Sequence, residues 1–293
     1  MAELCGFDVP DAKSPPPTDI VRALGAIADA SEFPAGPIIF RAAPERVEKI
    51  IVELQHVIDE GVLAPALSGK IFGKLMFMSS QFFARLGRAM LRAFSRRQHD
   101  KGRIALNPQL LAACRFWIAN ARELRPREIP LDMSSAPRIV SYSDGEGAKA
   151  GIGIAVWLPC GRVIAGYIQV PEILRQVWAR RAVGEDGERY DIFEVEALGP
   201  ALILANWGHL FPEGCLWMHY IDNEAALATL VKGSSSVMSS EIITAYTHEQ
   251  ISKRGIWPWF DRVDTHSNPV DQLSRGVMAG PWELLKIVFP RIS

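Results

Sequence analysis

The spacing of apolar residues changes sharply near residue 130 of this 293-residue chain. Before that point apolar side chains recur every three or four residues, which is the period of an amphipathic helix. After it they alternate or form short runs, which is typical of β-strands. The segment between, 125–137, carries Pro126, Pro130 and Pro137 and is interpreted as a linker. A chain of this length can supply two ordinary cores, so we expect two units joined at this linker.

The amino-terminal part is expected to be an irregular arm, 1–43, followed by a small helical module, 44–130. The arm is rich in proline and glycine, and its apolar runs 20–27 and 38–40 are expected either as edge strands or as an arm lying on the body. Helical spacing predicts three helices in the module, over 44–61, about 68–97, and 108 to about 124.

The carboxyl-terminal part, 131–293, is predicted to be an α/β domain. Its first three strands, expected over 138–147, 151–158 and 162–170, form an antiparallel meander. The elements expected after them are a helix 194–210, a strand 216–222, helices 223–233 and 239–253, a strand 259–265 and a short helix after Pro269. This order predicts a mixed sheet of three antiparallel strands and then parallel strands, with helices on its faces.

Composition limits the classes of partner. The net charge of −1 means that any nucleic-acid surface must be a local patch. The four cysteines include no C-x-x-C pair, which argues against a zinc site or a disulfide framework. The chain lacks a run of the ~20 apolar residues that a membrane span needs, and its start lacks a secretory signal. We therefore expect a soluble intracellular protein without a membrane partner; nucleus and cytoplasm stay open.

Four acids fall where a solvated surface charge is not the natural expectation. Asp144 lies late in the first predicted strand, and Asp222 ends the apolar strand 216–222. Glu196 lies in the first turns of a long apolar helix, and Asp271 opens the last helix. Carboxylates that come together repel one another, and bound divalent cations relieve that repulsion. Oxygen-only ligands select Mg²⁺, with Mn²⁺ as a substitute, and two such ions ~3.5–4 Å apart favour phosphodiester hydrolysis.

Periodicity alone does not prove that the four acids converge, and here a family resemblance adds to the argument. The segments SDGEGAKAGIGIAVW, EVEALGPALILANW, YIDNEAALATLVKG and NPVDQLSRG together resemble the ribonuclease H domains of retrotransposon-type reverse transcriptases. The resemblance implies a ribonuclease H-like fold that cuts the RNA strand of RNA·DNA hybrids with two Mg²⁺ ions. It assigns the catalytic and metal-binding roles to Asp144, Glu196, Asp222 and Asp271. Glu194 competes with Glu196, but Glu196 matches the E-A-L pattern better.

The amino-terminal part resembles, less specifically, the palm end, thumb and connection of retroelement reverse transcriptases. The segments that carry this resemblance are VRALG, GKLMFMSSQFFARLGRAMLRAF and LLAACRFW. The polymerase acids are missing and no Y-x-D-D-like sequence occurs, so DNA synthesis by this chain is not expected. A separate polymerase chain as a partner is left open.

Two features bear on whether such a site works. Gly199-Pro200 falls in the first turns of the acid-bearing helix, where it is expected to delay or bend the helix and displace Glu196. The long segment 171–193 before that helix is expected to cover the site or to extend the binding surface. His266 precedes the last acid in sequence, and the resemblance suggests a role in product release, with a purely structural role as the alternative.

A nucleic-acid ligand also requires a basic surface. Residues 70–103 hold nine Lys or Arg and one Asp. Arg85, Arg88, Arg92 and Arg96 recur at helical spacing and are predicted to contact phosphates, with a solvated helix face as the alternative. Asn223 and Asn268, next to the acids, are expected to hydrogen-bond nucleic acid, although a helix N-cap explains Asn223 equally well.

The first functional hypothesis is therefore a metal-dependent endoribonuclease acting on RNA·DNA hybrids. The alternative is a catalytically inactive, retroelement-derived module that binds nucleic acid or serves assembly. Clustered carboxylates favour the enzyme, because a scaffold has no use for them. An integrase-like nuclease is disfavoured because a glutamate is second in chain order.

Overall fold

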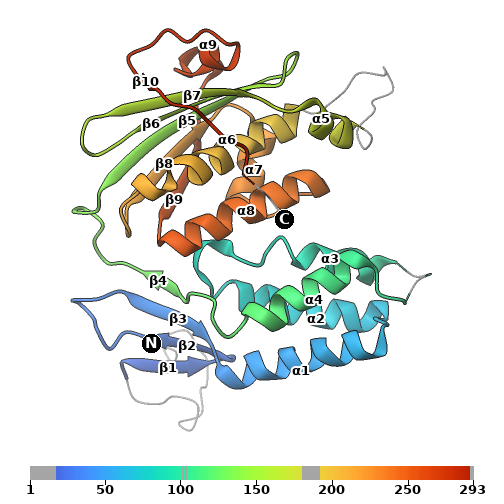
Figure 1. Cartoon of the computed structure of the whole chain (residues 1–293). Helices are drawn as coiled ribbons and strands as arrows, with labels where there is room; N and C mark the ends of the chain where they lie inside the picture. Colours follow the sequence, from blue (N-terminus) through green and yellow to red (C-terminus); the bar gives the residue numbers. More distant parts are fainter. Residues whose placement is uncertain (1–17, 101, 103, 180–191, 291–293) are drawn as a thin grey trace, which may run out of the picture.

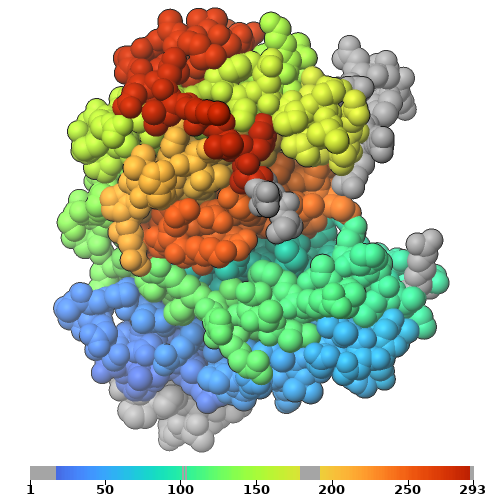
Figure 2. Space-filling model, viewed as in Figure 1, coloured from blue at the N-terminus to red at the C-terminus, as the bar shows by residue number. Residues whose placement is uncertain are grey.

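The computed structural model describes residues 18–100, 102, 104–179 and 192–290. Within that part of the chain it forms two units, one above the other in Figure 1. Figure 2 shows them in contact along a broad front, where α8 (Met238–Arg254) lies against the helices of the amino-terminal unit. Among the described helices, none has the length and apolar character needed to cross a bilayer.

The amino-terminal unit begins with a small antiparallel sheet. Strands β1 (Ile20–Ala23), β2 (Ala26–Asp29) and β3 (Ile38–Ala42) follow one another, and β4 (Arg127–Ile129) pairs with β3. The apolar runs of the arm are thus strands, but of these only β1 lies at an edge. The run 20–27 divides into β1 and β2 at a turn, and β2 and β3 lie inside the sheet, β3 because β4 pairs with it. The segment expected as a linker is partly a strand, because β3 has a free edge whose backbone groups need partners.

In the part of this unit that the structure describes, four helices pack beside the sheet. They are α1 (Pro44–Glu60), α2 (Pro65–Ser79), α3 (Leu91–His99) and α4 (Pro108–Asn120). Helix α1 ends at Glu60 and is capped by Gly61, whose positive φ of 68° ends the helix at the predicted place. The apolar faces of the four helices form one buried core around Leu54, Leu75 and Trp117.

The predicted continuous helix over 68–97 is wrong. Helix α2 ends at Ser79, and a short 3-10 turn, η3 (Phe83–Arg85), separates it from α3. The hydroxyls of Ser79 and Ser80 donate to carbonyls three residues back, which competes with helix continuation. Ala84 and Arg85 then both have φ of 55°, a left-handed conformation that no α-helix accommodates.

The described residues of the carboxyl-terminal unit form a sheet of six strands in the order β10-β7-β6-β5-β8-β9. The strands are β5 (Arg138–Glu146), β6 (Gly151–Trp157), β7 (Val163–Gln169), β8 (Leu216–Ile221), β9 (Trp257–Arg262) and β10 (Glu283–Leu284). Strands β5, β6 and β7 are antiparallel, while β8 runs parallel to β5 and β9 parallel to β8. The predicted fold class, a mixed sheet of an antiparallel meander followed by parallel strands with flanking helices, is confirmed.

Helices cover both faces of this sheet. They are α5 (Glu172–Ala179), α6 (Ile192–Trp207), α7 (Glu224–Lys232), α8 and the short α9 (Asp271–Ser274). Helix α6 packs on β5 and β6 and is backed by α8, whereas α9 lies across β6 on the other face (Figure 1). The residues 180–191, most of the predicted cover of the site, lie outside the described part of the chain.

Strand β6 shows why the two faces differ. Ile152, Ile154 and Val156 are fully buried in the main core with α6. The alternate residues Gly151, Gly153 and Ala155 face α9. A Cβ on Gly151 would lie 2.1 Å from a backbone oxygen of the α9 segment, so glycine is what lets this backbone approach the sheet.

Candidate metal centre

Three of the four predicted acids converge at one edge of the sheet. Asp144, Glu196 and Asp222 each offer a carboxylate oxygen, and these oxygens lie within 4.8 Å of one another. Strands β5 and β8 are parallel, with Tyr142 opposite Tyr220. Asp144 and Asp222 each come two residues after these tyrosines, so they lie at equivalent positions of the two neighbouring chain segments. Parallel strands bring their carboxyl ends to a common edge, and α6 carries Glu196 across β5 to meet them.

Two glycines allow this approach of helix and strand. A Cβ on Gly199 would lie 2.3 Å from both Cβ and Oγ of Ser143 in β5. A Cβ on Gly145 would lie 3.1 Å from the carboxylate carbon Cδ of Glu196. Larger residues at either position would therefore push α6 away from the strand that carries Asp144.

Pro200 does not displace Glu196, contrary to expectation. Helix α6 starts by Ile192 within the described residues and continues through Pro200 to Trp207. A proline inside a helix lacks the N–H that would bond to the carbonyl four residues earlier, here the carbonyl of Glu196. The close packing of the buried helix on β5 and β6 compensates for this single missing bond.

Asp144 is held from the α9 side by two groups. The hydroxyl of Ser274 donates a short hydrogen bond to its Oδ2. The amide of Asn268 donates to its Oδ1 at 3.3 Å and to the carbonyl of Ser143 at 3.1 Å. The Asn268 oxygen accepts from the N–H of Val270, so this buried amide is satisfied within the protein. It positions Asp144, a role that the sequence did not suggest for it.

The electrostatics favour a bound cation. Burial raises the pKa of Asp144 to about 6, although the hydrogen bond from Ser274 opposes the shift. Burial, and then repulsion by Asp144 and Asp222, raises the pKa of Glu196 well above its ordinary value, against a backbone hydrogen bond from Gly145. Oε2 of Glu196 and Oδ1 of Asp222 are buried and find no hydrogen-bond partner among the described residues. Crowded acids with unused buried oxygens fit a divalent cation with oxygen ligands.

The fourth predicted acid, Asp271, stays outside this group of three. Its Oδ1 accepts from Nη2 of Arg275 at 2.9 Å, and its Oδ2 accepts from Nε of Arg275 and from Gln272. Asp271 is nevertheless near enough to contribute to the raised pKa of Asp144. Its proposed role as a metal ligand stays a prediction.

The other predicted site residues do not join the cluster of Asp144, Glu196 and Asp222. Glu194 is buried, but it accepts from Ser239 of α8 at 2.6 Å and does not join the cluster. Asn223 is the N-cap of α7, as the alternative reading had it. His266 is exposed in the turn η5 (Thr265–Ser267), and Thr265 beside it donates to Asp222 at 2.9 Å. The role of His266 in product release stays a prediction.

The four arginines of the predicted basic stripe do not share one solvent-exposed helix face. Only Arg92 and Arg96 share a helix, because the chain turns at η3. Arg85 and Arg96 are exposed, whereas Arg88 and Arg92 are half-buried with their Nε atoms shielded from solvent. Arg92 and Arg96 lie near Glu241 of α8 and lower its pKa, which burial raises to about 7. Part of the stripe therefore contributes to the joint between the two units, and phosphate contact by it stays a prediction.

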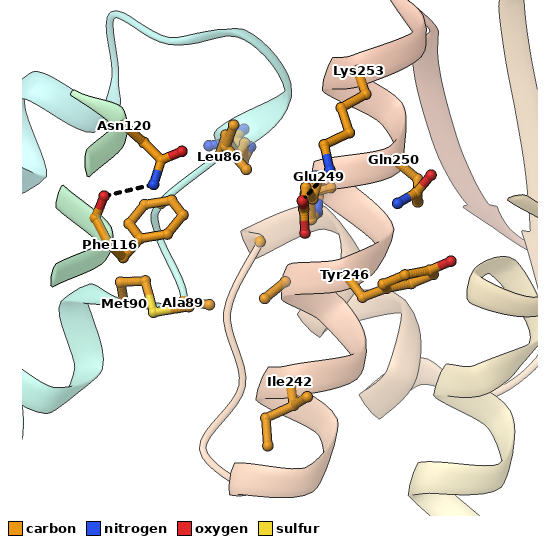
Figure 3. Close-up of a pocket in the computed structure, with 15 residues that line it drawn as sticks. Leu86, Ala89, Met90, Phe116, Asn120, Ile242, Tyr246, Glu249, Gln250 and Lys253 are labelled. Atoms are coloured by element: carbon orange, nitrogen blue, oxygen red, sulfur yellow. Dashed lines mark hydrogen bonds and ion pairs between the residues drawn. The ribbon is translucent and has the colours of Figure 1, made fainter. Parts of the chain in front are cut away.

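A cavity of about 480 Å³ lies at this joint. Figure 3 shows Phe116 and Asn120 of α4 on one side and Tyr246, Glu249 and Lys253 of α8 on the other. The Lys253 ammonium pairs with Glu249 at 2.5 Å. None of the clustered acids lines the cavity, so it is separate from the candidate metal centre.

Sequence reasoning also missed a buried polar network behind the acids. His219 is fully buried and bonds through one ring nitrogen to Ser141 at 2.9 Å and through the other to Ser143 at 3.1 Å. Burial lowers the pKa of His219 to about 3, so the ring is neutral. Trp217 donates to Ser141 at 2.7 Å, and the network ties β5 to β8. The alternating serines of SYSD were a signal for it, because they share one face of the strand.

No family model and no curated protein matches the chain. Among solved structures, RNase H1 from the halophilic archaeon Halobacterium salinarum NRC-1 is similar at 12% sequence identity and a TM-score of 0.34, over 45% of this chain and 89% of that chain.

Two foamy viral structures are also similar. The protease-reverse transcriptase dRH in complex with double-stranded DNA has 13% identity and a TM-score of 0.29, over 83% of this chain and 38% of that chain. The protease-reverse transcriptase in complex with an RNA/DNA hybrid has 11% identity and a TM-score of 0.26, over 83% of this chain and 29% of that chain. At these TM-scores the assignment of the fold rests on strand order and register.

Proposed function

We propose that this chain is a divalent-metal-dependent nuclease of the ribonuclease H type that cleaves the RNA strand of RNA·DNA hybrids. The observation that carries the proposal is the convergence of Asp144, Glu196 and Asp222 within 4.8 Å. Structural acids are normally paired with cations or kept apart, because the repulsion of unpaired buried carboxylates is costly. These three are buried or half-buried, and two of them keep an oxygen without a partner in the described part of the chain.

The three carboxylates would hold one divalent cation, Mg²⁺ or Mn²⁺, and Asp271 is the candidate fourth ligand for a second. Bound there, such ions supply an activated water and stabilise the negative charge that develops on the departing 3′ oxygen. The chain itself contributes the positioning of the acids. Asn268 and Ser274 fix the carboxylate of Asp144, and Thr265 fixes one oxygen of Asp222.

Exposed arginines provide the proposed hold on the substrate backbone. Arg85 and Arg96 are the members of the predicted stripe that solvent reaches most freely. Guanidinium groups bind phosphate oxygens in pairs, and such contacts make binding salt-dependent. We expect Arg85→Gln and Arg96→Gln to weaken hybrid binding and flatten its salt dependence. An unchanged slope of affinity against salt would remove these arginines from the proposal.

The test is cleavage of an RNA·DNA hybrid labelled on the RNA strand, in Mg²⁺ and in Mn²⁺, with RNA and DNA duplexes alongside. Only the hybrid is expected to be cut. Glu196→Gln should abolish cutting while hybrid binding persists. Glu194→Gln is the matched control, because this second buried carboxylate is on the same helix but outside the cluster.

Each outcome of this test is decisive. Binding without cutting by the wild-type chain in both metals would refute the enzyme and support the alternative of an inactive nucleic-acid-binding module. Equal losses of activity in Glu194→Gln and Glu196→Gln, with both proteins folded, would refute the assignment of the metal ligands.

A further inference from the structure

Asp271 differs from the other three acids in how its oxygens are used. Arg275 makes a two-point contact with it, Nη2 to Oδ1 at 2.9 Å and Nε to Oδ2 at 3.3 Å. Gln272 donates to Oδ2 as well, at 3.1 Å. Glu196 and Asp222, by contrast, each keep a buried oxygen without a partner among the described residues. The fourth carboxylate is therefore already neutralised by a cation of its own chain.

The backbone that carries this ion pair has little room to move. A Cβ on Gly151 would lie 2.1 Å from the carbonyl oxygen of Ser274, and one on Gly153 would lie 2.6 Å from its nitrogen. The segment is thus pressed directly onto β6, and Asn268 and Ser274 attach it to Asp144. A shift of the whole segment would break those contacts. Asp271 can approach the cluster only by rotating its side chain, and that rotation requires release from Arg275.

Arg275 has an alternative partner when nucleic acid is bound. Its side chain is 55% exposed, while that of Asp271 is 20% exposed, so solvent and ligands reach the cation more easily than the acid. A guanidinium group pairs with phosphate by the same two-point geometry that it uses with a carboxylate. A phosphate of a bound strand can therefore take Arg275 from Asp271 and leave this carboxylate without its counter-cation, bonded only to the neutral amide of Gln272.

We propose that Arg275 is a built-in counter-cation that keeps Asp271 from binding metal until nucleic acid arrives. The free protein then binds one divalent ion, through Asp144, Glu196 and Asp222, and the second ion enters when a substrate phosphate draws Arg275 away. This inference rests on the proposed function, since it assigns an order of assembly to the same site. Arg275 is a positioning residue here, because it acts through Asp271.

The experiment is a titration of the full chain with Mn²⁺, in the absence of nucleic acid. Electron paramagnetic resonance measures the free Mn²⁺, and the bound ion is obtained by difference. Wild type should bind one ion tightly. Arg275→Gln should strengthen the second site on the order of 10–100-fold, the range in which groups that orient metal ligands change metal affinity. Asp271→Asn in the Arg275→Gln background should cancel that gain, and Arg275→Lys, which retains the charge, should stay close to wild type.

Arg262→Gln is the matched control for the loss of one positive charge. Arg262 is 54% exposed, pairs with Glu224 at 3.4 Å, and lies opposite the residue before Asp222. Its removal should leave the second site weak. An equal gain in Arg262→Gln would reduce the effect to net charge and overturn the inference.

The remaining outcomes separate this inference from the proposed function. Two tight ions in wild type, or a single ion in both wild type and Arg275→Gln, would overturn the role of Arg275 and leave the metal centre intact. Absence of Mn²⁺ binding in wild type, with no difference from Asp222→Asn, would overturn the metal centre itself.

Discussion

Replacing Gly199 with alanine tests the idea that close packing of α6 on β5 builds the metal centre. The new Cβ would lie 2.3 Å from Cβ and Oγ of Ser143, whereas ordinary contact begins at 3.4 Å. Helix and strand must therefore part by the difference, 3.4 minus 2.3, or about 1.1 Å. Glu196 is three residues earlier on the same helix and moves with it.

That displacement is large for a metal site and modest for a fold. Ligand distances in metal sites are set to about ±0.2 Å, so a shift of ~1 Å should weaken metal binding on the order of 10–100-fold. Overpacking costs about 1–3 kcal/mol of folding stability, and the better helix propensity of alanine returns about 1 kcal/mol. We expect a net destabilisation of about 0–2 kcal/mol, much less than a loss of fold.

The assay pairs Mn²⁺ titration and hybrid cleavage with thermal unfolding of the metal-free protein. Ser143→Gly in the Gly199→Ala background removes both clashing atoms, and the next nearest atom, Cα of Ser143, lies at 3.8 Å. Metal binding should return to that of Ser143→Gly alone. Gly73→Ala in α2 is the matched control, because its Cβ meets nothing within 4 Å.

The reasoning is refuted if folded Gly199→Ala binds metal as wild type does. Failure of Ser143→Gly to restore binding would also refute it, because the loss would then have a cause other than the clash. A comparable loss in Gly73→Ala would show that the effect is not local to the site.

Three further predictions concern charge and positioning. Burial raises the pKa of Glu241 from 4.5 to about 7, although Arg92 and Arg96 oppose the shift. Between these two pH values the folded protein holds a proton that the unfolded chain has released, so folding stability falls as the pH rises toward 7. Glu241→Gln should therefore raise the melting temperature more at about pH 8 than at about pH 5, and an equal change at both would contradict this origin. The pKa of Asp144, raised to about 6, means that protons compete with metal below that pH, so stabilisation by Mg²⁺ in a melting scan should be larger at about pH 8 than at about pH 5. Asn268→Ala removes a donor from the buried carbonyl of Ser143 and from Asp144, which should cost about 1–3 kcal/mol in denaturant unfolding and weaken Mn²⁺ binding. Unchanged binding would show that Asn268 does not position the metal ligands.

The sheet of the carboxyl-terminal unit was predictable because its strands have distinct burial patterns. Strand β6 reads as a buried strand, and β8 has a short apolar run bounded by Cys215 and Asp222. The two aspartates were predictable from their places in the strands, since Asp222 directly follows the apolar run of β8 and Asp144 lies late in β5. Glu196 was distinguished from Glu194 by motif alone, and the contact of Glu194 with α8 depends on a helix distant in sequence.

Other features depend on contacts that period and propensity do not encode. The break between α2 and α3 comes from serine hydroxyls that bond to nearby carbonyls in an otherwise helical pattern. Strand β4 forms because β3 has an open edge beside it, which no local pattern in Arg127–Ile129 reveals. The pairing of Asp271 with Arg275 is an i to i+4 contact and was visible in principle.

The turn η3 also joins the two units of the chain. Phe83 belongs by sequence to the helical module, but it is 3% exposed within the core of the carboxyl-terminal unit, edge-on to Trp257 at 4.8 Å. A fragment cut at the linker would leave a gap of the size of a phenyl ring beside that tryptophan, and such gaps cost several kcal/mol. The linker near residue 130 is therefore not expected to separate two independently folding units. The carboxyl-terminal unit takes Phe83 from its neighbour into its own core, and the two units are expected to fold and unfold together.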